Sequence, residues 1–362
     1  MIPDPSMVLT FAVHVCVSLV VAFVLLARAR APLSLRDGAL ILAGTALASF
    51  GIGLLTAPTP GGFAKLLVWS WTLAVVLPTT AFAIAVRAGP VLPVRLAFLA
   101  VGLLGGLLAV DAFVWEPRNL EISHHEVISD RLDAPLRIAV IADLQTDVPG
   151  DHERAALQAV LAAKPDVILF AGDVIQHHDE AAYAHAWSTL QGIAAPLQLD
   201  APLGVYMVEG DSEFPHATWA PKAESLGMTV LPDAPVSRAL RDDVTLTGMG
   251  LRASARTDLS IERPDERFHV VFGHRPAFAL GDIDAELLLA GHTHGGQVQV
   301  PGWGPLLTLS KVPRSWASGR TELGGERTLI VSRGVGMERA VAPRIRFWCR
   351  PEVVIVDVRP PA

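Results

Sequence analysis

The chain has 362 residues, which is enough for two domains, and 51% of them are hydrophobic, a high share for a soluble protein. Residues 1–115 hold only six of the 29 basic and three of the 36 acidic side chains, so residues 116–362 carry the other 23 and 33. This distribution predicts a membrane domain joined to an acidic, water-soluble one. The acidic balance argues against a nucleic-acid partner. Two cysteines, Cys16 and Cys349, are too few for a disulfide framework.

The first third contains four apolar stretches, each close to the roughly 20 helical residues that cross a bilayer core. They are residues 8–27, 38–57, 66–86 and 96–115. The first stretch lacks the basic start of a signal peptide and is followed by further spans, so we interpret it as a retained helix. The sequence therefore predicts an all-α, four-helix transmembrane domain over residues 1–115. This makes the chain a multi-pass protein of the cell membrane, with the lipid bilayer as a partner.

The basic residues of the predicted loops indicate an orientation. The loop between the second and third spans has only Lys65, whereas the other two loops carry five arginines. These are Arg28, Arg30, Arg36, Arg87 and Arg95. Because basic loops stay in the cytoplasm, we expect both termini, and the soluble domain, on the exoplasmic or periplasmic side. A transporter is disfavoured, since we expect almost no buried polar residues from which the spans could build a substrate path.

The remaining residues alternate predicted strands and helices after a predicted linker at 116–135. Within the domain at 136–362, strands are predicted at 136–142, 167–170, 204–208, 268–272 and 287–290. Helices are predicted at 151–163 and 181–192, and late strands at 328–332 and 353–358. Such alternation predicts an α/β domain whose early strands pair largely in parallel.

Potential metal ligands follow five of these strands. They are Asp143, Asp173, Asp211, His274 and the pair His292 and His294. Ligands of α/β sheets bind outside the carboxyl ends of the strands, so we expect one shared site. Carboxylates and imidazoles together suit divalent ions such as Mn, Fe or Zn. If one carboxylate bridges, six or seven ligands can hold two ions.

Two such ions lower the pKa of a bound water and stabilise the attacking and leaving oxygens of an in-line displacement. This chemistry predicts hydrolysis of a phosphoester or a pyrophosphate. The sequence contains no Gly-x-Ser-x-Gly elbow for a serine hydrolase. It also contains no GxxxxGK[ST] loop or GxGxxG fingerprint for nucleotide energy coupling or dinucleotide redox chemistry.

The segments around these residues resemble the calcineurin-like metallophosphoesterase family, whose pattern is D-x-H, GD, GNH[DE], a single H after a strand, and GHxH. In the same order the chain has Asp143-Leu144-Gln145, Gly172-Asp173, Gly210-Asp211-Ser212-Glu213, Gly273-His274 and Gly291-His292-Thr293-His294. The resemblance covers residues 136–358 and implies a sandwich of two β-sheets flanked by helices. Residues 331–336 also resemble members with N-terminal membrane helices. Some membrane-associated relatives act on lipid-linked substrates such as UDP-diacylglucosamine.

The resemblance further implies a role for each ligand. The first metal ion would be bound by Asp143, Gln145 and His294, and the second by Asp211, His274 and His292, with Asp173 bridging the two. Asp173, Asp211 and His292 would be the catalytic residues, and no substrate-binding residue is predicted.

The chain departs from the family pattern at three positions. Gln145 replaces a histidine and is a neutral, weaker ligand. Asp211 replaces an asparagine, which adds a negative charge at the second metal. Ser212 replaces the histidine that helps to protonate the leaving group. Other candidates for that proton are His177, His178 and His216, each of which we expect to be a surface histidine.

We therefore predict a membrane-anchored, metal-dependent phosphohydrolase, for which a phosphorylated and lipid-linked small molecule is a reasonable substrate. The alternative, motivated by Gln145 and Ser212, is a catalytically degenerate member that binds metal or a phosphorylated ligand at the membrane as a sensor or scaffold.

Overall fold

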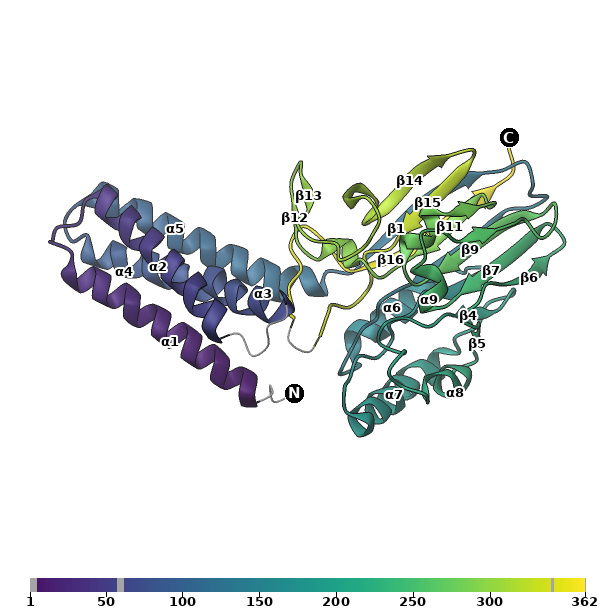
Figure 1. Cartoon of the computed structure of the whole chain (residues 1–362), viewed down its shortest axis with the longest axis horizontal. Coiled ribbons are helices and arrows are strands. Elements are labelled where there is room, and N and C mark those ends of the chain that lie inside the picture. The colour runs from purple at the N-terminus through teal and green to yellow at the C-terminus, as the bar shows by residue number, and fades with distance from the viewer. Residues whose placement is uncertain (1–4, 57–61, 340–341, 362) are drawn as a thin grey trace. The chain divides into compact units, whose positions relative to one another are not determined.

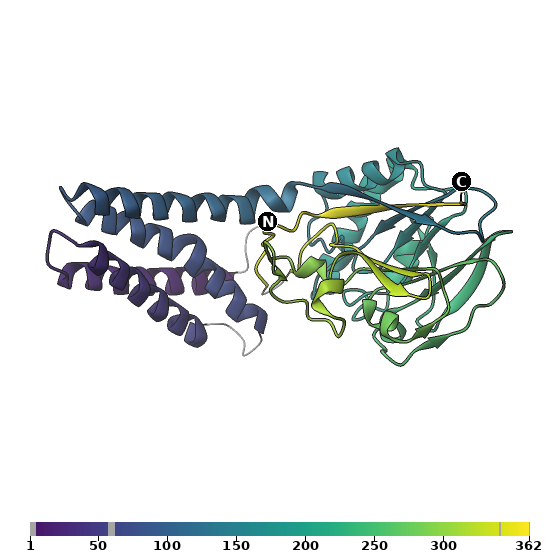
Figure 2. The same ribbon diagram turned by 90° about the horizontal axis from the view of Figure 1, so that it is seen from above.

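The computed structural model describes residues 5–56, 62–339 and 342–361. Its Cα positions divide into two compact units (Figures 1 and 2). The first comprises Met1–Trp115 and Ala340–Arg344, and the second comprises Glu116–Arg339 and Ile345–Ala362.

The secondary structure of the first unit is helical throughout its described residues. Its elements are α1 (Pro5–Arg28), α2 (Leu35–Thr56), α3 (Gly62–Trp71), the π-helical turn η1 (Thr72–Val76), α4 (Leu77–Arg87), α5 (Leu92–Val110) and a second π-helical turn, η2 (Asp111–Trp115). Four helical segments are long and apolar enough to cross a membrane: Leu9–Arg28, Leu35–Leu55, Phe63–Arg87 and Leu92–Arg118. The four predicted apolar helices are therefore confirmed, although Ala57, the expected end of the second, lies outside the described residues.

A buried polar cluster lies among these helices, where we expected almost no buried polar residues. Ser49 Oγ lies 2.8 Å from Thr72 Oγ1 and 2.9 Å from Ser18 Oγ. His14 Nε2 lies 3.1 Å from Thr72 Oγ1. Because apolar surroundings offer no water to these groups, they satisfy one another across the helices and help to fix their packing. The expectation was wrong in this respect, since hydropathy averages conceal single serines and threonines.

The second unit contains two six-stranded sheets. The first has the order β1 (Glu121–Ile128), β16 (Glu352–Arg359), β2 (Leu136–Ile141), β3 (Val167–Phe170), β4 (Val205–Met207), β5 (Thr229–Val230). The second has the order β14 (Gly319–Gly324), β15 (Arg327–Val331), β11 (Leu287–Ala290), β9 (Phe268–Gly273), β7 (Val244–Met249), β6 (Val236–Arg241). Strands β2 to β5 pair in parallel, as the strand–helix alternation predicts for the early strands. Strands β7, β9, β11 and β15 of the second sheet also pair in parallel.

One large core lies between the two sheets. Val140 and Leu169 of the first sheet share one buried cluster with Phe272 and Leu289 of the second. Helices α6 (Asp151–Ala162) and α7 (Glu180–Ala194) cover the other face of the first sheet, with Trp187 fully buried there. The short helices α8 (Trp219–Glu224), α9 (Leu251–Ser254) and η5 (Pro276–Leu280) complete the flanks. A sandwich of two sheets flanked by helices is the fold class that we predicted.

The predicted linker at 116–135 differs from the structure, because Glu121–Ile128 form β1 within the first sheet. Strand β1 pairs in parallel with β16 along its whole length, and the two lie side by side in Figure 2 as blue and yellow strands. The partner strand lies more than 200 residues away in the sequence, so no local signal reveals the pairing. Its burial alternates, with Ile122, His124, Glu126 and Ile128 exposed, and it lies at the edge of the sheet.

Candidate metal centre

The predicted ligands lie just beyond the carboxyl ends of strands from both sheets. Asp143, Asp173 and Asp211 follow β2, β3 and β4 of the first sheet, and His274 and His292 follow β9 and β11 of the second. Backbone hydrogen bonds join these ends: Asp143 N donates to Gly172 O at 3.0 Å, and Gly291 N donates to His274 O at 3.0 Å. The sandwich therefore brings residues that are up to 150 positions apart to one edge.

The backbone at this edge is strained in the same way at five predicted ligands. Their φ angles are positive although none is glycine: Asp143 49°, Gln145 34°, Asp173 56°, His292 72° and His294 50°. A positive φ is uncommon for such residues and costs free energy, so the surrounding structure must hold it. Strain of this kind gathers at functional sites, where it aims side chains at a ligand.

Two glycines allow the carboxylates to approach the backbone closely. A Cβ on Gly210 would lie 2.3 Å from Asp173 Oδ1, and one on Gly291 would lie 2.8 Å from Asp143 Oδ2. Neither position could carry a side chain without moving the carboxylate. Gly210 and Gly291 therefore allow close packing around the two buried carboxylates of Asp173 and Asp143.

One group of ligand atoms comprises Asp211, His274 and His292. Asp211 Oδ2 lies 2.9 Å from His292 Nδ1 and 3.2 Å from His274 Nε2. His274 Nδ1 donates to the carbonyl of Ala171 at 2.7 Å, which turns Nε2 toward the carboxylates. The Asp211 side chain is 37% exposed, so this group faces the rim of the centre.

A second group comprises Asp143, Asp173 and His274, all buried. His274 Nε2 lies 3.5 Å from Asp173 Oδ2, and its Nδ1 lies 3.9 Å from Asp143 Oδ1. Asp143 also accepts the backbone N–H of His292, at 3.0 Å to Oδ2. The other oxygen of Asp173, Oδ1, accepts the backbone N–H of Ser212 at 2.7 Å. His274 is thus the residue that the two groups share, and Asp173 lies next to it.

Two further predicted ligands each have a buried polar atom without a hydrogen-bond partner. These atoms are Oε1 of Gln145 and Nδ1 of His294. Leaving a buried oxygen or nitrogen unpaired costs about 1–3 kcal/mol, so native structures rarely leave one without purpose. Oxygen and imidazole nitrogen are the donors that divalent first-row metals take. The residues present therefore fit divalent metal ions.

The electrostatics of the buried acids support the same conclusion. Burial and the neighbouring Asp173 carboxylate raise the pKa of Asp143 to about 8, although nearby His274 opposes the shift. Burial alone would lower the pKa of His274, but Asp173, Asp211 and Asp143 outweigh it and raise that pKa to about 10. The centre has an excess of negative charge that a proton or a cation must balance.

Asp211 has a partner that the sequence analysis missed. Arg275, which directly follows His274, donates from Nε to Asp211 Oδ2 at 3.2 Å and from its Nη2 to Oδ1. Burial disfavours the ionised form of Asp211, yet hydrogen bonds from His274, His292 and Arg275 lower its pKa well below the usual range. The charge that Asp211 adds at this position is therefore partly balanced by Arg275.

Two glutamates that we had assigned no role also support the centre. Glu213 accepts backbone N–H bonds from Asp173 and Val174 at 2.7 Å and from Gly210 at 2.9 Å, and so ties the two loops together. Burial and the adjacent Asp173 raise the pKa of Glu213 to about 7. Glu338, half-buried, accepts from the amide of Gln145. Glu213 is the last residue of the segment that matches the family's GNH[DE] motif, so the sequence could have indicated its importance. Glu338 lies in no motif.

The three histidines considered as proton donors have different environments. His216 is buried rather than on the surface, with Nδ1 2.6 Å from Glu180 Oε2 and Nε2 2.8 Å from the carbonyl of His177. It also stacks on Tyr183, with ring centroids 3.6 Å apart. Both nitrogens are thus engaged in holding this loop. His178 is exposed and His177 half-buried.

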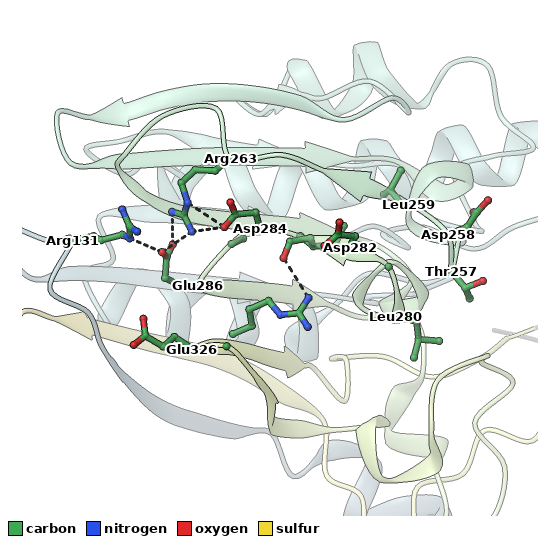
Figure 3. A pocket seen from close by; sticks show the side chains of 15 residues that line it. Arg131, Thr257, Asp258, Leu259, Arg263, Leu280, Asp282, Asp284, Glu286 and Glu326 are labelled. Carbon is green, nitrogen blue, oxygen red and sulfur yellow. Dashed lines mark hydrogen bonds and ion pairs between the residues drawn. The ribbon is translucent and has the colours of Figure 1, made fainter.

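A cavity of about 740 Å³ lies elsewhere in the second unit, and none of the predicted ligands lines it. Charged side chains that line it form ion pairs. Glu286 contacts Arg131 at 2.9 Å and Arg263 at 2.7 Å, and Asp284 contacts Arg263 at 2.8 Å (Figure 3). The charged groups of these pairs already satisfy one another, in contrast to the unpartnered atoms of the metal centre.

A two-sheet sandwich with carboxylates and imidazoles gathered at its strand ends has the donors that a metal-dependent hydrolase requires. The calcineurin-like phosphoesterase family model matches residues 136–296. Residues 136–296 therefore form a calcineurin-like phosphoesterase domain, whose activity is phosphoester hydrolysis with divalent metal ions.

The sequence of the chain is similar to those of other metallophosphoesterases. The chain is 27% identical over 264 residues to the uncharacterized metallophosphoesterase YkuE of Bacillus subtilis (strain 168), covering 67% of this chain and 87% of that protein. It is 27% identical over 254 residues to phosphodiesterase YaeI of Escherichia coli (strain K12), covering 67% and 90%. Among solved structures, a dimetal phosphatase from Danio rerio superposes with a TM-score of 0.37 at 13% identity, over 56% of this chain and 88% of that one.

Proposed function

We propose that this protein is a membrane-anchored phosphohydrolase that uses two divalent ions, Mn, Fe or Zn, to cleave a phosphodiester or pyrophosphate in an amphiphilic substrate. The observation that carries the proposal is the convergence of Asp143, Asp173, Asp211, His274 and His292 at one edge, beside the unpartnered Gln145 Oε1 and His294 Nδ1. A donor set of this size exceeds what one ion requires.

The proposed ligand sets are those that the resemblance to the family implies. Asp143, Gln145 and His294 would hold the first ion, and Asp211, His274 and His292 the second, with Asp173 between them. When bound, the ions would supply an activated water and charge stabilisation for in-line displacement at phosphorus. The chain's own part is to orient the donors, through Ala171 O for His274 and through Glu213 for the loop of Asp173.

Membrane anchoring is the second part of the proposal. Four helices of the first unit are long and apolar enough to span a bilayer, and the arginine-rich loops favour a phosphoesterase domain on the exoplasmic or periplasmic side. An enzyme held at a bilayer meets lipid-linked phosphoesters at high local concentration. This supports an amphiphilic, lipid-linked substrate.

A second candidate function is a degenerate metal- or phosphate-binding sensor or scaffold. The observation in its favour is the environment of position 212, where Ser212 Oγ lies 3.3 Å from Glu213 Oε1 and offers no acidic proton. The buried His216, with both nitrogens engaged, is not free to replace it. Loss of general acid catalysis costs roughly 10²–10⁴-fold, which slows metal-driven hydrolysis without abolishing it.

Turnover of the full-length protein distinguishes the two candidates. The purified protein, stripped with EDTA and reloaded with Mn²⁺, is given bis(p-nitrophenyl) phosphate and p-nitrophenyl phosphate. We expect metal-dependent release of nitrophenol, lost in His292→Ala and retained in the control His178→Ala, whose side chain is exposed. Equal, metal-independent rates for all three proteins would refute the hydrolase and favour the sensor.

A further inference from the structure

An exposed apolar surface stands next to the metal centre in the second unit. After η6 (His294–Gly296), the chain forms a hairpin in which β12 (Gln299–Val300) pairs with β13 (Gly304–Pro305) (Figure 1). The described residues of this unit expose eleven large apolar side chains, and six belong to this hairpin and one neighbour. We call these six the apolar hairpin surface: Val300, Trp303, Leu306, Leu307, Leu309 and Trp348.

Backbone contacts unite Trp348 with the hairpin. Phe347, directly before it, accepts from Gln299 N at 2.9 Å, and Phe347 N donates to Gln297 O at 2.9 Å. Trp348 is 61% exposed and Trp303 is 64% exposed. This surface exposes two indoles and three leucines, although the unit buries most of its other large apolar side chains. Such an exposed apolar patch indicates a surface that contacts an apolar partner.

The contacts of Glu116 locate this surface relative to the point where the chain enters the unit. The Glu116 carboxylate accepts from Cys349 N at 2.8 Å, and Cys349 directly follows Trp348. Glu116 also lies within the last candidate membrane span, Leu92–Arg118, and β1 begins at Glu121. The three residues from 118 to 121 can reach only about 10 Å when fully extended. Within the second unit, the surface therefore lies close to the residues at which the last candidate span ends. On the proposed membrane anchoring, lipid headgroups are the partner expected there.

The segments that carry the surface contain basic but no acidic residues. No acidic residue occurs between Glu286 and Glu322 or between Glu338 and Glu352, although residues 116–362 contain 33 acids. The basic side chains of these stretches include Lys311 and Arg314, and the Arg314 guanidinium lies 4.9 Å from the centre of the Trp303 ring. Basic side chains favour anionic headgroups, and indoles favour the membrane–water interface.

The hairpin is also continuous with a predicted metal ligand. His294 stands in η6, and Gln299 Nε2 donates to the carbonyl of Gly295 at 3.0 Å, which ties the base of the hairpin to that segment. Movement of the hairpin base would therefore displace the segment that carries His294. A surface fixed at headgroup depth would hold the metal centre at a constant height above it.

We propose that the apolar hairpin surface rests in the headgroup region of a bilayer with anionic lipids and so presents the metal centre to phosphoesters at the membrane surface. This inference rests on the proposed membrane anchoring and narrows the substrate to one whose phosphoester lies at the interface. A soluble phosphoester would gain nothing from this surface.

Spin labels on the full-length protein in vesicles of phosphatidylcholine and phosphatidylglycerol test the proposal. In a Cys16→Ser background, Leu306→Cys places a label on the surface, and Arg238→Cys places one on the exposed strand β6 as a control. Cys349 is buried, and the unlabelled Cys16→Ser parent verifies that it does not react. We expect the label at 306 to collide more with oxygen than with a water-soluble nickel chelate, and the label at 238 to show the reverse.

The outcomes separate the possible failures. Protein that leaves the vesicles in alkaline carbonate would overturn the anchoring on which the inference rests. Protein that stays, with a label at 306 as accessible to nickel as that at 238, would overturn the hairpin inference alone. A label shielded from both reagents would also overturn it, since it would indicate a protein partner. In agreement with the proposal, Trp303→Ser with Leu306→Ser should lower turnover of a vesicle-embedded phosphodiester several-fold and leave bis(p-nitrophenyl) phosphate turnover unchanged.

Discussion

The side-chain amide of Gln145 donates from Nε2 to Oε2 of Glu338 across 3.1 Å. An ionised carboxylate only accepts, so this contact fixes which end of the amide faces Glu338 and leaves Oε1 buried and unpartnered. Gln176 donates to the other oxygen of Glu338 at 2.7 Å, which holds the carboxylate in place. Glu338 thus keeps the oxygen of Gln145 free for a cation and adds a negative charge near a ligand that is itself neutral.

Replacing Glu338 should weaken the first metal site. We expect Glu338→Gln to lower Mn²⁺ affinity there by roughly tenfold to a hundredfold, because an amide at 338 no longer fixes the orientation of Gln145. Calorimetric titration of the EDTA-stripped protein measures this, with the exposed Glu262→Gln as a matched control. In a Gln145→His background, where the imidazole restores the family pattern, the first site should bind more tightly and depend less on Glu338. Affinity unaltered by Glu338→Gln would show that the contact has no part in metal binding.

Asp173 and Asp211 should differ in the cost of losing their charge. The resemblance to the family implies that Asp173 bridges the two ions, whereas Asp211 would bind only the second ion and shares its charge with Arg275. Asp173→Asn should therefore lose metal at both sites, and about 10²-fold or more in kcat if several kcal/mol of charge stabilisation disappear. Asp211→Asn should lose affinity at one site only. Metal content by elemental analysis compares them, and an equal loss in both variants would contradict a bridging Asp173.

Metal removal should make the stability of the protein depend on pH. Without metal, burial and Asp173 raise the pKa of Asp143 to about 8, and the surrounding carboxylates overcome burial to raise the pKa of His274 to about 10. In the unfolded chain these groups titrate near 3.9 and 6.5. The pKa values of His292 and His294 are lowered, chiefly by burial, which offsets this effect at acidic pH. Above about pH 6.5 the folded state binds more protons, and stability falls as the pH rises toward 10.

Thermal unfolding at a series of pH values measures the direction of this pH dependence. In EDTA we expect the melting temperature to fall as the pH rises through neutrality and beyond. Saturating Mn²⁺ should raise the melting temperature and flatten that slope, because the cations replace the protons. The same slope with and without metal would mean that Asp143 and His274 do not bind the ion.

A histidine at position 212 should supply the proton that Ser212 cannot. We expect Ser212→His to raise kcat by up to about 10²-fold for substrates with poor leaving groups, such as alkyl phosphodiesters, and to change p-nitrophenyl release little. Comparing kcat across leaving groups of graded pKa measures the effect. Parallel rates for wild type and variant over the whole series would indicate that another group already provides the proton.

Much of the centre was predictable because its ligands are local features of strand ends. Asp143, Asp173 and His274 each follow an apolar, strand-forming run, and the carboxyl ends of parallel strands meet at one edge. The family resemblance added the assignment of individual ligands. Helices α6 and α7 were predictable from their apolar spacing and acidic first turns.

Other features depend on contacts between distant residues. Strand β1 forms because it pairs with β16, whereas the sequence of its eight residues alone predicts a polar linker. His216 looks like a surface histidine until Glu180 and Tyr183 enclose it. The roles of Glu338 and Arg275 arise only when the loops meet at Gln145 and Asp211. Short-range patterns carry no information about such partners.

Elemental analysis of the purified full-length protein tests the central claim most directly. After reloading with Mn²⁺ and removal of excess metal, we predict two ions per chain in the wild type and a large loss in Asp173→Asn. Fewer than one ion per chain in the wild type, or a content indifferent to the Asp173→Asn change, would contradict a two-metal centre built from these strand ends.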